Sequence, residues 1–502
     1  MTWWRDAVVY QIYPRSFRDS DCDGVGDLEG IRSELDYLVW LGVDTLWLSP
    51  IYPSPMKDFG YDVANYVDVE RLFGSLEQFD GLIRDAHARG LRVLLDWVPN
   101  HTSSEHPWFS ESRSSRSNPR RDWYVWRDAR EAGSPPNNWV RAWSEGSAWT
   151  WDGATGQYYL HCFLDSQPDL NWANVDVRQT MHDTLRFWLD RGVDGFRMDV
   201  VHLLGKDLDA DDPDDLKAMS HVPLNDVPVT HEYLREIRAV LEEYDNERVS
   251  VGEVYLIDPN RVAAYYGRGD ELHLSFNFAS LYTPWNAEAW RDLIATTEAA
   301  MNPVGAWPTW VMSNHDNVRV ATRLGADDRR VRAAMTLLLT LRGTPFLYAG
   351  EELGLRDATV PPDRVVDPGG RDGCRSPLPW DVDALHGWPA TPWLPFVDNA
   401  SQFSVEAQRD DPDSMLHFTK TLLDLRHRDD TLRHGDIDGL VASDGVLRFI
   451  RHHAGRRVMV VVNFSDTDSA VAVAVEGRLL LSSAGGARAG SLLPAEAQVI
   501  EL

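Results

Sequence analysis

Short runs of apolar and β-branched residues recur along the first 352 positions of the chain, and longer stretches with helical spacing separate many of them. Eight runs fit this description: AVVYQIYP (7–14), TLWLSPI (45–51), LRVLLDWVP (91–99), DGFRMDVV (194–201), RVSVGEVY (248–255), LHLSFNF (272–278), PTWVMSN (308–314) and TPFLYAGEE (344–352). Strands that are apolar on both faces and alternate with helices form parallel sheets. The eight runs therefore predict an α/β fold whose sheet closes into a (β/α)₈ barrel.

Three of the intervening stretches have clear amphipathic spacing. They are IRSELDYLVWLG (31–42), LEQFDGLIRDAHARG (76–90) and VRQTMHDTLRFWLDRG (177–192). Each ends at a glycine, which is the residue that most readily adopts the left-handed conformation at a helix C-terminus. The pattern predicts that these three stretches are helices on the outside of the barrel.

Two regions lack the alternation of strands and helices. Residues 101–172 follow the third run and are rich in Trp, Pro, Ser and Arg, so we expect an irregular inserted domain on the rim of the barrel. From about residue 435 the chain contains only short apolar runs, VLRFIRHHA, RRVMVVVNFS, SAVAVA, GRLLLSS and AQVIEL, which predict a β-sandwich. The predicted domains are the barrel (1–100 and 173–434), the inserted domain (101–172) and the C-terminal β-sandwich domain (435–502).

Charged and polar residues gather where the predicted strands end, which is the face of a (β/α)₈ barrel that carries chemistry. Arg197 and Asp199 lie two positions apart in the fourth run, so their side chains are expected on the same face of the strand. The other strand ends supply Asp96, Asn100, His101, Glu253, Asn314, His315 and Asp316. The sequence thus predicts a site in which carboxylates from several strands meet two histidines and one arginine.

Two carboxyl groups with different pKa values are what glycoside hydrolysis requires. One attacks the anomeric carbon, and the other protonates the leaving oxygen. We expect Arg197 to favour the charged form of Asp199, which would make Asp199 the nucleophile. Glu253 has no such cation beside it in the sequence, and we expect it to be the protonated acid.

The charge and the composition narrow the range of partners. The formal net charge of −29 repels nucleic acid and anionic membranes, and it suits a neutral substrate. No apolar run approaches the roughly 20 residues that span a bilayer, and the first residues do not resemble a secretory signal. The cysteines, Cys22, Cys162 and Cys374, have no metal-ligand spacing. We therefore expect a reduced, cytoplasmic protein without membrane or nucleic-acid partners.

Four segments resemble the signature regions of the α-amylase superfamily of glycoside hydrolases: DWVPNH (96–101), GFRMDV (195–200), GEVY (252–255) and SNHD (313–316). QPDLNW (167–172) and GTPFLYAGEELG (343–354) are similar to its secondary motifs, and the resemblance follows the family's order along essentially the entire chain. GYD (60–62) and GRDGCRSPLPW (370–380) resemble the branch that contains exo-acting α-glucosidases and oligo-1,6-glucosidases.

The resemblance implies three catalytic residues. Asp199 would be the nucleophile that forms a β-glucosyl-enzyme, and Glu253 would be the general acid/base. Asp316 would hold the 2- and 3-hydroxyls of the bound glucose and distort its ring. The enzyme would release glucose as the α-anomer, with retention of configuration.

The resemblance also implies a set of substrate contacts. Tyr61 would stack beneath the first glucose, and Asp62 with Arg375 would grip the hydroxyls at its non-reducing end. That contact would close the pocket behind the first sugar, so that single glucose units are removed. The remaining implied substrate-binding residues are His101, Phe163, Arg197, His315 and Arg371.

A metal loop is implied after the first strand. Acidic residues at alternate positions in DSDCDGVGD (19–27) resemble the first half of an EF-hand loop, but Gly30 stands where an EF-hand requires a bidentate glutamate. The segment does match the metal loop of the α-glucosidase branch. The implied ligands are Asp19, Asp21, Asp23, Asp27 and the Val25 carbonyl, around a structural Ca²⁺ or Mg²⁺.

The resemblance gives two conflicting cues about linkage. In this branch a valine after the nucleophile, here Val200, often accompanies α-1,6 activity, whereas GRDGCRSPLPW is similar to bacterial maltase-type enzymes. We expect maltose and short α-1,4 oligosaccharides to be favoured and isomaltose to be accepted as well. An oligo-1,6-glucosidase, or a glucosyl-transferring enzyme such as a sucrose isomerase or trehalose synthase, stays an alternative. A non-catalytic sugar-binding homologue would lack Asp199 or Glu253, and both are present.

Overall fold

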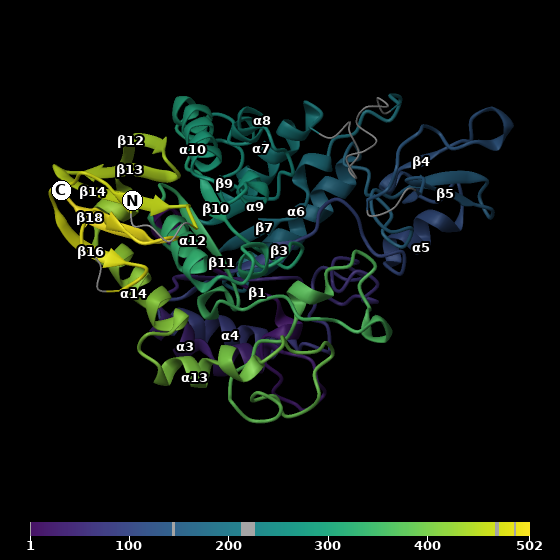
Figure 1. Ribbon diagram of the computed structural model, residues 1–502. Coiled ribbons are helices and arrows are strands. Elements are labelled where there is room, and N and C mark those ends of the chain that lie inside the picture. Colours follow the sequence, from purple (N-terminus) through teal and green to yellow (C-terminus); the bar gives the residue numbers. More distant parts are fainter. Residues whose placement is uncertain (1, 143–145, 212–225, 467–470, 486–487) are drawn as a thin grey trace.

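Eight parallel strands form a barrel in the computed structural model, which describes residues 2–142, 146–211, 226–466, 471–485 and 488–502. Their order around the sheet is β10-β11-β1-β2-β3-β7-β8-β9 (Figure 1). At the remaining seam, the Thr309 hydroxyl donates to the Ser275 carbonyl at 2.8 Å and accepts from the Asn277 N–H at 3.1 Å. The strands are β1 (Val9–Ile12), β2 (Thr45–Leu48), β3 (Arg92–Trp97), β7 (Gly195–Met198), β8 (Val249–Gly252), β9 (Leu274–Ser275), β10 (Thr309–Val311) and β11 (Thr344–Tyr348).

Each of the eight predicted runs contains one of these strands, which confirms the (β/α)₈ barrel. The strands are shorter than the runs because the chain leaves the sheet and bends onto the rim. The fourth run shows this clearly, since β7 ends at Met198 and Val200 has the left-handed values φ 37° and ψ 42°. Asp199 therefore projects from a turn just beyond the strand rather than from the strand itself.

Helices cover the outside of the barrel. In α4 (Leu76–Ala88) the buried residues Phe79, Leu82, Ile83 and Ala86 recur with helical spacing and face inward. The stretch 31–42 is not one helix, because the chain breaks at Glu34 between α2 (Leu28–Ser33) and α3 (Leu35–Leu41). The other long helices are α6 (Val175–Asp190), α7 (Val229–Leu241), α10 (Ala287–Met301), α12 (Asp328–Thr340) and α14 (Met415–Arg428).

Short helices complete the shell. They are α1 (Trp3–Asp6), α8 (Pro259–Ala264), α9 (Ala279–Tyr282), α11 (Val320–Arg323), α13 (Val405–Asp410) and α15 (Asp430–His434). The glycines expected at the C-termini of three helices, Gly42, Gly90 and Gly192, all have positive φ. Within the described part of the chain, no helix has both the length and the apolar character that crossing a membrane requires.

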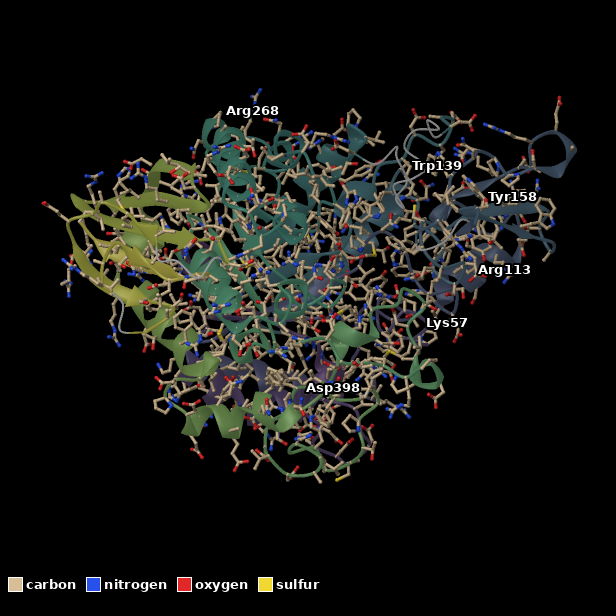
Figure 2. The ribbon with its side chains drawn as sticks, viewed as in Figure 1. Lys57, Arg113, Trp139, Tyr158, Arg268 and Asp398 are labelled. Carbon is tan, nitrogen blue, oxygen red and sulfur yellow. The ribbon has the colours of Figure 1, made fainter. Side chains whose placement is uncertain are left out.

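The segment between β3 and β7 is more regular than its composition suggests. It contains α5 (Pro107–Ser114) and a three-stranded antiparallel sheet in the order β4-β6-β5. These strands are β4 (Trp126–Arg127), β5 (Trp149–Asp152) and β6 (Gln157–Leu160). Arg113 at the end of α5 pairs with Asp152 at 2.9 Å, and Arg113 and Tyr158 mark this projecting part of the molecule in Figure 2. The range 101–172 for an inserted domain stays a prediction.

The C-terminal region is antiparallel and all-β, as expected. A five-stranded sheet has the order β12-β13-β14-β18-β16, and β15 pairs with β17 in a separate two-stranded ribbon. Apolar side chains from both, including Met459, Val461, Leu492 and Ile500, form a common core. The strands are β12 (Asp436–Ser443), β13 (Val446–His453), β14 (Arg456–Asn463), β15 (Val471–Ala472), β16 (Arg478–Ser482), β17 (Ser491–Leu492) and β18 (Ala497–Glu501). The sequence did not predict β12.

A buried arginine of this sheet bonds to the barrel, and a second buried arginine, in α14, bonds within the barrel nearby. Arg451 of β13 donates to the carbonyls of Thr340 and Gly435, each at 2.6 Å. Arg426 of α14 donates to the carbonyls of Leu339 and Gly343 at 2.9 and 2.8 Å. The carbonyls of Leu339 and Thr340 belong to the last turn of α12. Carbonyls in the last turn of a helix have no hydrogen-bond partner within the helix, and a cation is favourable there.

Candidate active site

A cavity of about 270 Å³ opens at the C-terminal ends of the barrel strands. Loops that follow different strands form its wall, which is where a (β/α)₈ barrel holds its reactive groups. Among the predicted site residues, those that line it are Tyr61, His101, Phe163, Asp199, Glu253, Asp316 and Arg371. The other predicted substrate-binding residues, Asp62, Arg197, His315 and Arg375, are buried behind this wall.

One buried guanidinium joins three carboxyl groups. Parallel pairing of β3 with β7 places Asp96 opposite Arg197. Nη1 of Arg197 donates to Asp96 at 2.7 Å and to Asp199 at 2.8 Å, and Nη2 donates to Glu253. Because the guanidinium is rigid and planar, Asp199 and Glu253 are held close together at one cation.

Arg197 does not distinguish Asp199 from Glu253 in the way that the sequence suggested. Arg197 was expected to serve Asp199 alone, but it binds Glu253 as well. Burial raises the pKa of Asp199 well above its usual range, against the pull of Arg197, and Glu253 and Asp96 add to the rise. Burial also raises the pKa of Asp96, to about 6, although Arg197 opposes it. Three carboxyl groups at one cation therefore favour a retained proton. Arg197 does favour the charged form of Asp199 as expected, but it acts against burial and two neighbouring carboxyl groups.

Asp316 has the opposite electrostatic environment. Its Oδ1 accepts from Arg371 and from Arg375, both at 2.9 Å, and its Oδ2 lies 3.2 Å from His315 Nε2. Burial acts to raise the pKa of Asp316, but His315 and the two guanidiniums outweigh it and hold the pKa well below the usual range. Asp316 is therefore a charged acceptor for hydroxyl groups in the cavity.

Asp62 and Arg375, which were expected to grip the hydroxyls at the non-reducing end, do not line the cavity. Asp62 accepts hydrogen bonds from the Ser54 hydroxyl at 2.8 Å and from two backbone N–H groups of its own loop, at 2.9 and 3.0 Å. Arg375 instead donates a hydrogen bond to the carboxylate of Asp316. Asp58 lines the cavity and pairs with Arg371 at 2.7 Å. Asp58 with Arg371 is thus an aspartate–arginine pair at the cavity that the sequence did not predict, and Asp62 shapes the loop.

His101 and Phe163 form another part of the wall, with ring centroids 5.0 Å apart. Burial lowers the pKa of His101, although Asp169 acts to raise it, so the imidazole is neutral. The side-chain amide nitrogens of Asn100 and Gln167 lie 3.2 Å from its two ring nitrogens. A neutral hydrogen-bonding ring beside an apolar one suits a sugar, which presents hydroxyls and C–H faces together.

Tyr61 turns its hydroxyl away from the cavity and into the protein. The hydroxyl lies 3.0 Å from Asp96 Oδ2 and 2.7 Å from His315 Nε2. The rings of Tyr61 and His315 stack at 5.3 Å with an interplanar angle of 5°. His315 therefore supports Tyr61 from behind. It was expected to bind the substrate, but it does not line the cavity.

Sequence reasoning missed several residues that line the cavity, among them Asp58, Tyr255, Tyr282 and Asn317. The hydroxyls of Tyr255 and Tyr282 hydrogen-bond to each other, and Tyr282 also donates to Asn317 at 3.3 Å. Tyr255 is the last residue of the GEVY motif and Asn317 directly follows SNHD, which was an available signal. Tyr282 lies in a short helix and had no such signal.

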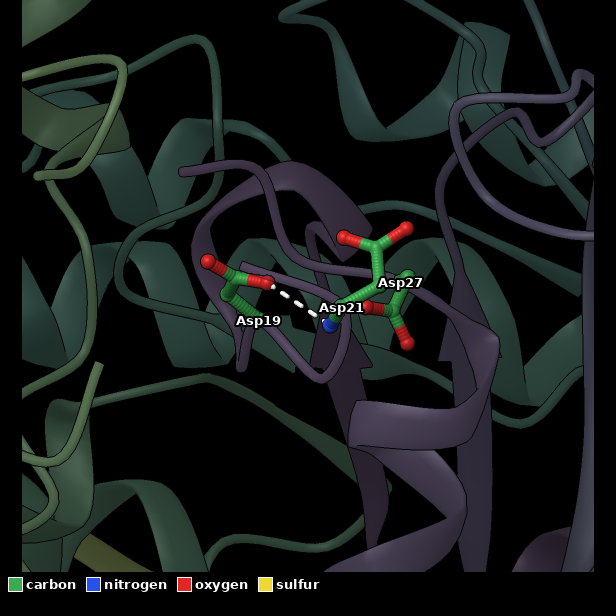
Figure 3. Close-up of side chains that lie close together, drawn as sticks. All are labelled: Asp19, Asp21 and Asp27. Atoms are coloured by element: carbon green, nitrogen blue, oxygen red, sulfur yellow. Dashed lines mark hydrogen bonds between the residues drawn. The ribbon is translucent and has the colours of Figure 1, made fainter. Parts of the chain in front are cut away.

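The loop after β1 gathers three of the predicted metal ligands. One carboxylate oxygen from each of Asp19, Asp21 and Asp27 lies within 4.8 Å of the others (Figure 3). Asp19 also accepts from three backbone N–H groups of the loop, which hold its carboxylate inward. Burial, followed by the charges of neighbouring aspartates, raises the pKa of Asp21. This crowding of oxygen ligands fits a hard cation; Asp23 is exposed and lies outside the group of three.

Comparison with known proteins agrees with this geometry. The family model described as "Alpha amylase, catalytic domain" matches residues 11–435, and the model of a domain of unknown function, DUF3459, matches residues 435–500. A Rhizobium meliloti protein named "Probable alpha-glucosidase" is 42% identical over 503 residues, covering 92% of this chain and 90% of its own. A Parageobacillus thermoglucosidasius protein named "Oligo-1,6-glucosidase" is 38% identical over 515 residues, covering 92% and 91%.

Solved structures show the same likeness. The crystal structure of an alpha-glucosyl transfer enzyme, XgtA, superposes with a TM-score of 0.94 at 40% sequence identity, covering 100% of this chain and 99% of that one. The family match extends over most of the chain, and the barrel, the carboxylate site and the relatives agree with it. The chain therefore belongs to the α-amylase family and is a glycoside hydrolase.

Proposed function

We propose that the protein is a retaining exo-α-glucosidase that releases glucose from the non-reducing end of short α-glucosides. The observation that carries this proposal is the pair Asp199 and Glu253, held at the single guanidinium of Arg197 and both open to the cavity. Retaining glycosidases need two carboxyl groups at about 5–5.5 Å, one as nucleophile and one as acid. A shared cation keeps the two groups close enough for those roles.

The reaction follows from that pair. Asp199 attacks the anomeric carbon and forms a covalent β-glucosyl ester, while the carboxylic acid of Glu253 gives its proton to the leaving oxygen. In the second step, Glu253 takes a proton from water, whose oxygen attacks the same carbon and displaces Asp199. Two inversions give net retention, so glucose leaves as the α-anomer.

The size and charge of the cavity favour a single terminal glucose. Its volume of about 270 Å³ lies just below the range usual for small-molecule sites, about 300–1,000 Å³. Arg371 links Asp58 and Asp316 in its wall, with distances of 2.7 and 2.9 Å. These paired charges offer several hydrogen-bonding groups to the hydroxyls of one sugar ring. An arrangement of this kind suits exo-cleavage more than the binding of a long chain.

Linkage preference is proposed to include both α-1,4 and α-1,6 bonds, with maltose and short malto-oligosaccharides favoured. Val200 lies beside the nucleophile in the cavity wall, and the named relatives include both an alpha-glucosidase and an oligo-1,6-glucosidase. A methyl-sized contact changes discrimination by only about 1–3 kcal/mol. Mixed specificity is therefore physically reasonable.

Glucosyl transfer is a second candidate. Tyr255, Tyr282 and Asn317 form a hydrogen-bonded group in the cavity wall, and Tyr282 is 50% exposed. An aromatic surface there can hold an acceptor sugar against its C–H face and so compete with water. The structural likeness to an enzyme named for alpha-glucosyl transfer supports this alternative.

We further propose that Asp19, Asp21 and Asp27, with Asp23 and the Val25 carbonyl, hold a structural Ca²⁺ or Mg²⁺. The cation would relieve the repulsion between the carboxylates and fix the loop that precedes α2.

The cysteines form no disulfide among the described residues, and free thiols are typical of reducing compartments. That supports our proposal of a cytoplasmic location.

A panel of maltose, isomaltose, sucrose, trehalose and soluble starch tests the exo-glucosidase activity. Maltose is expected to give glucose fastest, with isomaltose within about 200-fold in kcat/KM, since the two differ by only a few contacts. Starch should yield free glucose and no oligosaccharides of intermediate length. Products are identified by chromatography; intermediate oligosaccharides from starch, or rearranged disaccharides from sucrose, would contradict the proposal.

Azide distinguishes the nucleophile from the acid/base. With an activated aryl α-glucoside, Asp199→Gly plus azide should give β-glucosyl azide, because azide replaces the missing carboxylate on the face opposite the leaving group. Glu253→Gly plus azide should give α-glucosyl azide, because azide attacks the glucosyl-enzyme from the other face. Without azide, kcat/KM on maltose should fall by at least about 10³-fold in both variants.

The exposed carboxylate of Asp183 provides the control for these variants. Asp183→Asn should hydrolyse the aryl glucoside at the wild-type rate and form no azide adduct. NMR spectroscopy identifies the anomer of each product. If the two glycine variants gave the same anomer, or the reverse assignment, the proposed roles of Asp199 and Glu253 would be wrong.

Chelation tests the metal loop. Removing the cation with EDTA should lower the melting temperature by a few degrees, about 2–6 °C, because ligand binding to the folded state alone stabilises it. Added Ca²⁺ or Mg²⁺ should restore it. Asp21→Asn should be less sensitive to EDTA, whereas Asp36→Asn, an exposed control, should behave as wild type. An unchanged melting temperature in the EDTA-treated wild type counts against the site.

A further inference from the structure

A buried row of hydrogen bonds connects strand β1 to the carboxyl cluster. Gln11 Nε2 lies 2.7 Å from His315 Nδ1, and His315 Nε2 lies 2.7 Å from the Tyr61 hydroxyl. The Tyr61 hydroxyl lies 3.0 Å from Asp96, which in turn accepts from Arg197 at 2.7 Å. Gln11 is 1% exposed and His315 and Asp96 are 0% exposed. Each donor in the row must therefore be matched by an acceptor inside the protein.

The carboxylates fix the direction of these hydrogen bonds. An ionised Asp96 can only accept, so the Tyr61 hydroxyl donates to it and its oxygen is left to accept from His315. His315 Nε2 also faces a second acceptor, Asp316 Oδ2, at 3.2 Å. Both contacts require a proton on Nε2. The direction thus follows from groups at the far end of the row from Gln11.

The opposite nitrogen of the His315 ring then needs a donor. Burial lowers the pKa of His315 to about 3, so the ring is neutral and carries one proton. With that proton on Nε2, Nδ1 presents a buried lone pair. The side-chain amide of Gln11 lies against it at 2.7 Å, and Gln11 Nε2 supplies the N–H.

We propose that Gln11 is a positioning residue of the active site, which fixes His315 as the neutral tautomer protonated on Nε2. By supplying the donor that the lone pair on Nδ1 requires, it supports the arrangement in which Tyr61 donates to Asp96. Through Asp96, it affects how Arg197 is shared with the two carboxyl groups at the cavity. The inference rests on the proposed function for its kinetic consequence, but the tautomer itself can be measured without turnover.

The groups around His315 favour this neutral state. The ring of Tyr13 stacks on it at 5.7 Å, and Trp47 meets it edge-on at 6.2 Å. The charged neighbours from other elements are Arg375, Arg197 and Arg371, which all oppose a second proton, and Asp316 favours one. A further carboxylate added at Nδ1 would shift this balance towards a protonated ring.

The first measurement is the tautomer of His315 in the full-length wild-type protein. Long-range ¹H–¹⁵N NMR spectra of protein labelled with ¹⁵N-histidine distinguish a protonated from an unprotonated ring nitrogen, and His315→Asn assigns the signal. We expect a proton on Nε2, a lone pair on Nδ1, and no titration between pH 5 and pH 8. A proton on Nδ1 of the wild-type protein would overturn the inference by itself.

The second measurement uses Gln11→Glu, in which the new carboxylate can only accept. The His315 proton must then move to Nδ1, or the ring must become a cation that this carboxylate stabilises. We expect His315 to titrate between pH 5 and pH 8, and the pH profile of kcat/KM to gain a limb at the same pH. Above that limb kcat/KM should be lower by about 10- to 100-fold, because Tyr61 then donates to His315 instead of Asp96.

Two further variants separate positioning from packing. Gln11→Met keeps the length of the side chain without a donor, and it should lower kcat/KM less than Gln11→Glu and add no limb. Ser49→Ala removes the other polar neighbour of Gln11 Nε2, at 3.3 Å, and should leave the pH profile as in wild type. An unchanged tautomer and profile in Gln11→Glu, or equal losses in both Gln11 variants without a new limb, would show a merely structural role. If Gln11→Glu does not fold, the wild-type tautomer decides.

Discussion

The structure depends on one buried guanidinium that has to serve three carboxyl groups. Arg197 is 2% exposed and donates to Asp96, Asp199 and Glu253. Removing one partner from a buried ion pair typically costs about 3–5 kcal/mol, because the remaining charge is left unpaired. Here the same contacts that satisfy the buried charge also hold the reacting groups together. The chemistry and the stability of the barrel interior therefore rest on the same side chain.

Backbone hydrogen bonds of the barrel bring the residues that carry these groups close together. Pairing of β3 with β7 puts Asp96 beside Arg197, and the Glu253 N–H bonds to the Met198 carbonyl at 2.8 Å. Between them Val200 adopts a left-handed conformation, which is rare and costly for a β-branched residue. That turn directs Asp199 towards the cavity and places the Val200 N–H 3.3 Å from Glu253. Local strain at this position is thus tied to the geometry of the site.

The sequence predicted the parts of the molecule that have a regular period. The eight strands were recognisable because their residues are apolar on both faces, and Arg197 and Asp199 were conspicuous because they interrupt one of them. The loop after β2 could not be predicted in this way, because Met56, Phe59 and Gly60 all have positive φ. These conformations change the direction in which side chains point, so Asp58 faces the cavity and Asp62 does not. The sequence predicted that carboxylates from several strand ends meet one arginine, but it did not predict that Asp96, Asp199 and Glu253 all bind the same guanidinium.

The most direct test of this account is the titration of the aspartates at Arg197. Carboxyl-labelled aspartate allows Asp96 and Asp199 to be followed by ¹³C NMR in the full chain, with Asp96→Asn to assign the signals. If three carboxyl groups share one guanidinium, at least one of these two aspartates should titrate near pH 6 or above. Its pKa should fall in Glu253→Gln, which removes one of the competing charges. If both aspartates titrated below about pH 4 in the wild-type protein, as isolated carboxyl groups do, the central role of the shared guanidinium would be contradicted.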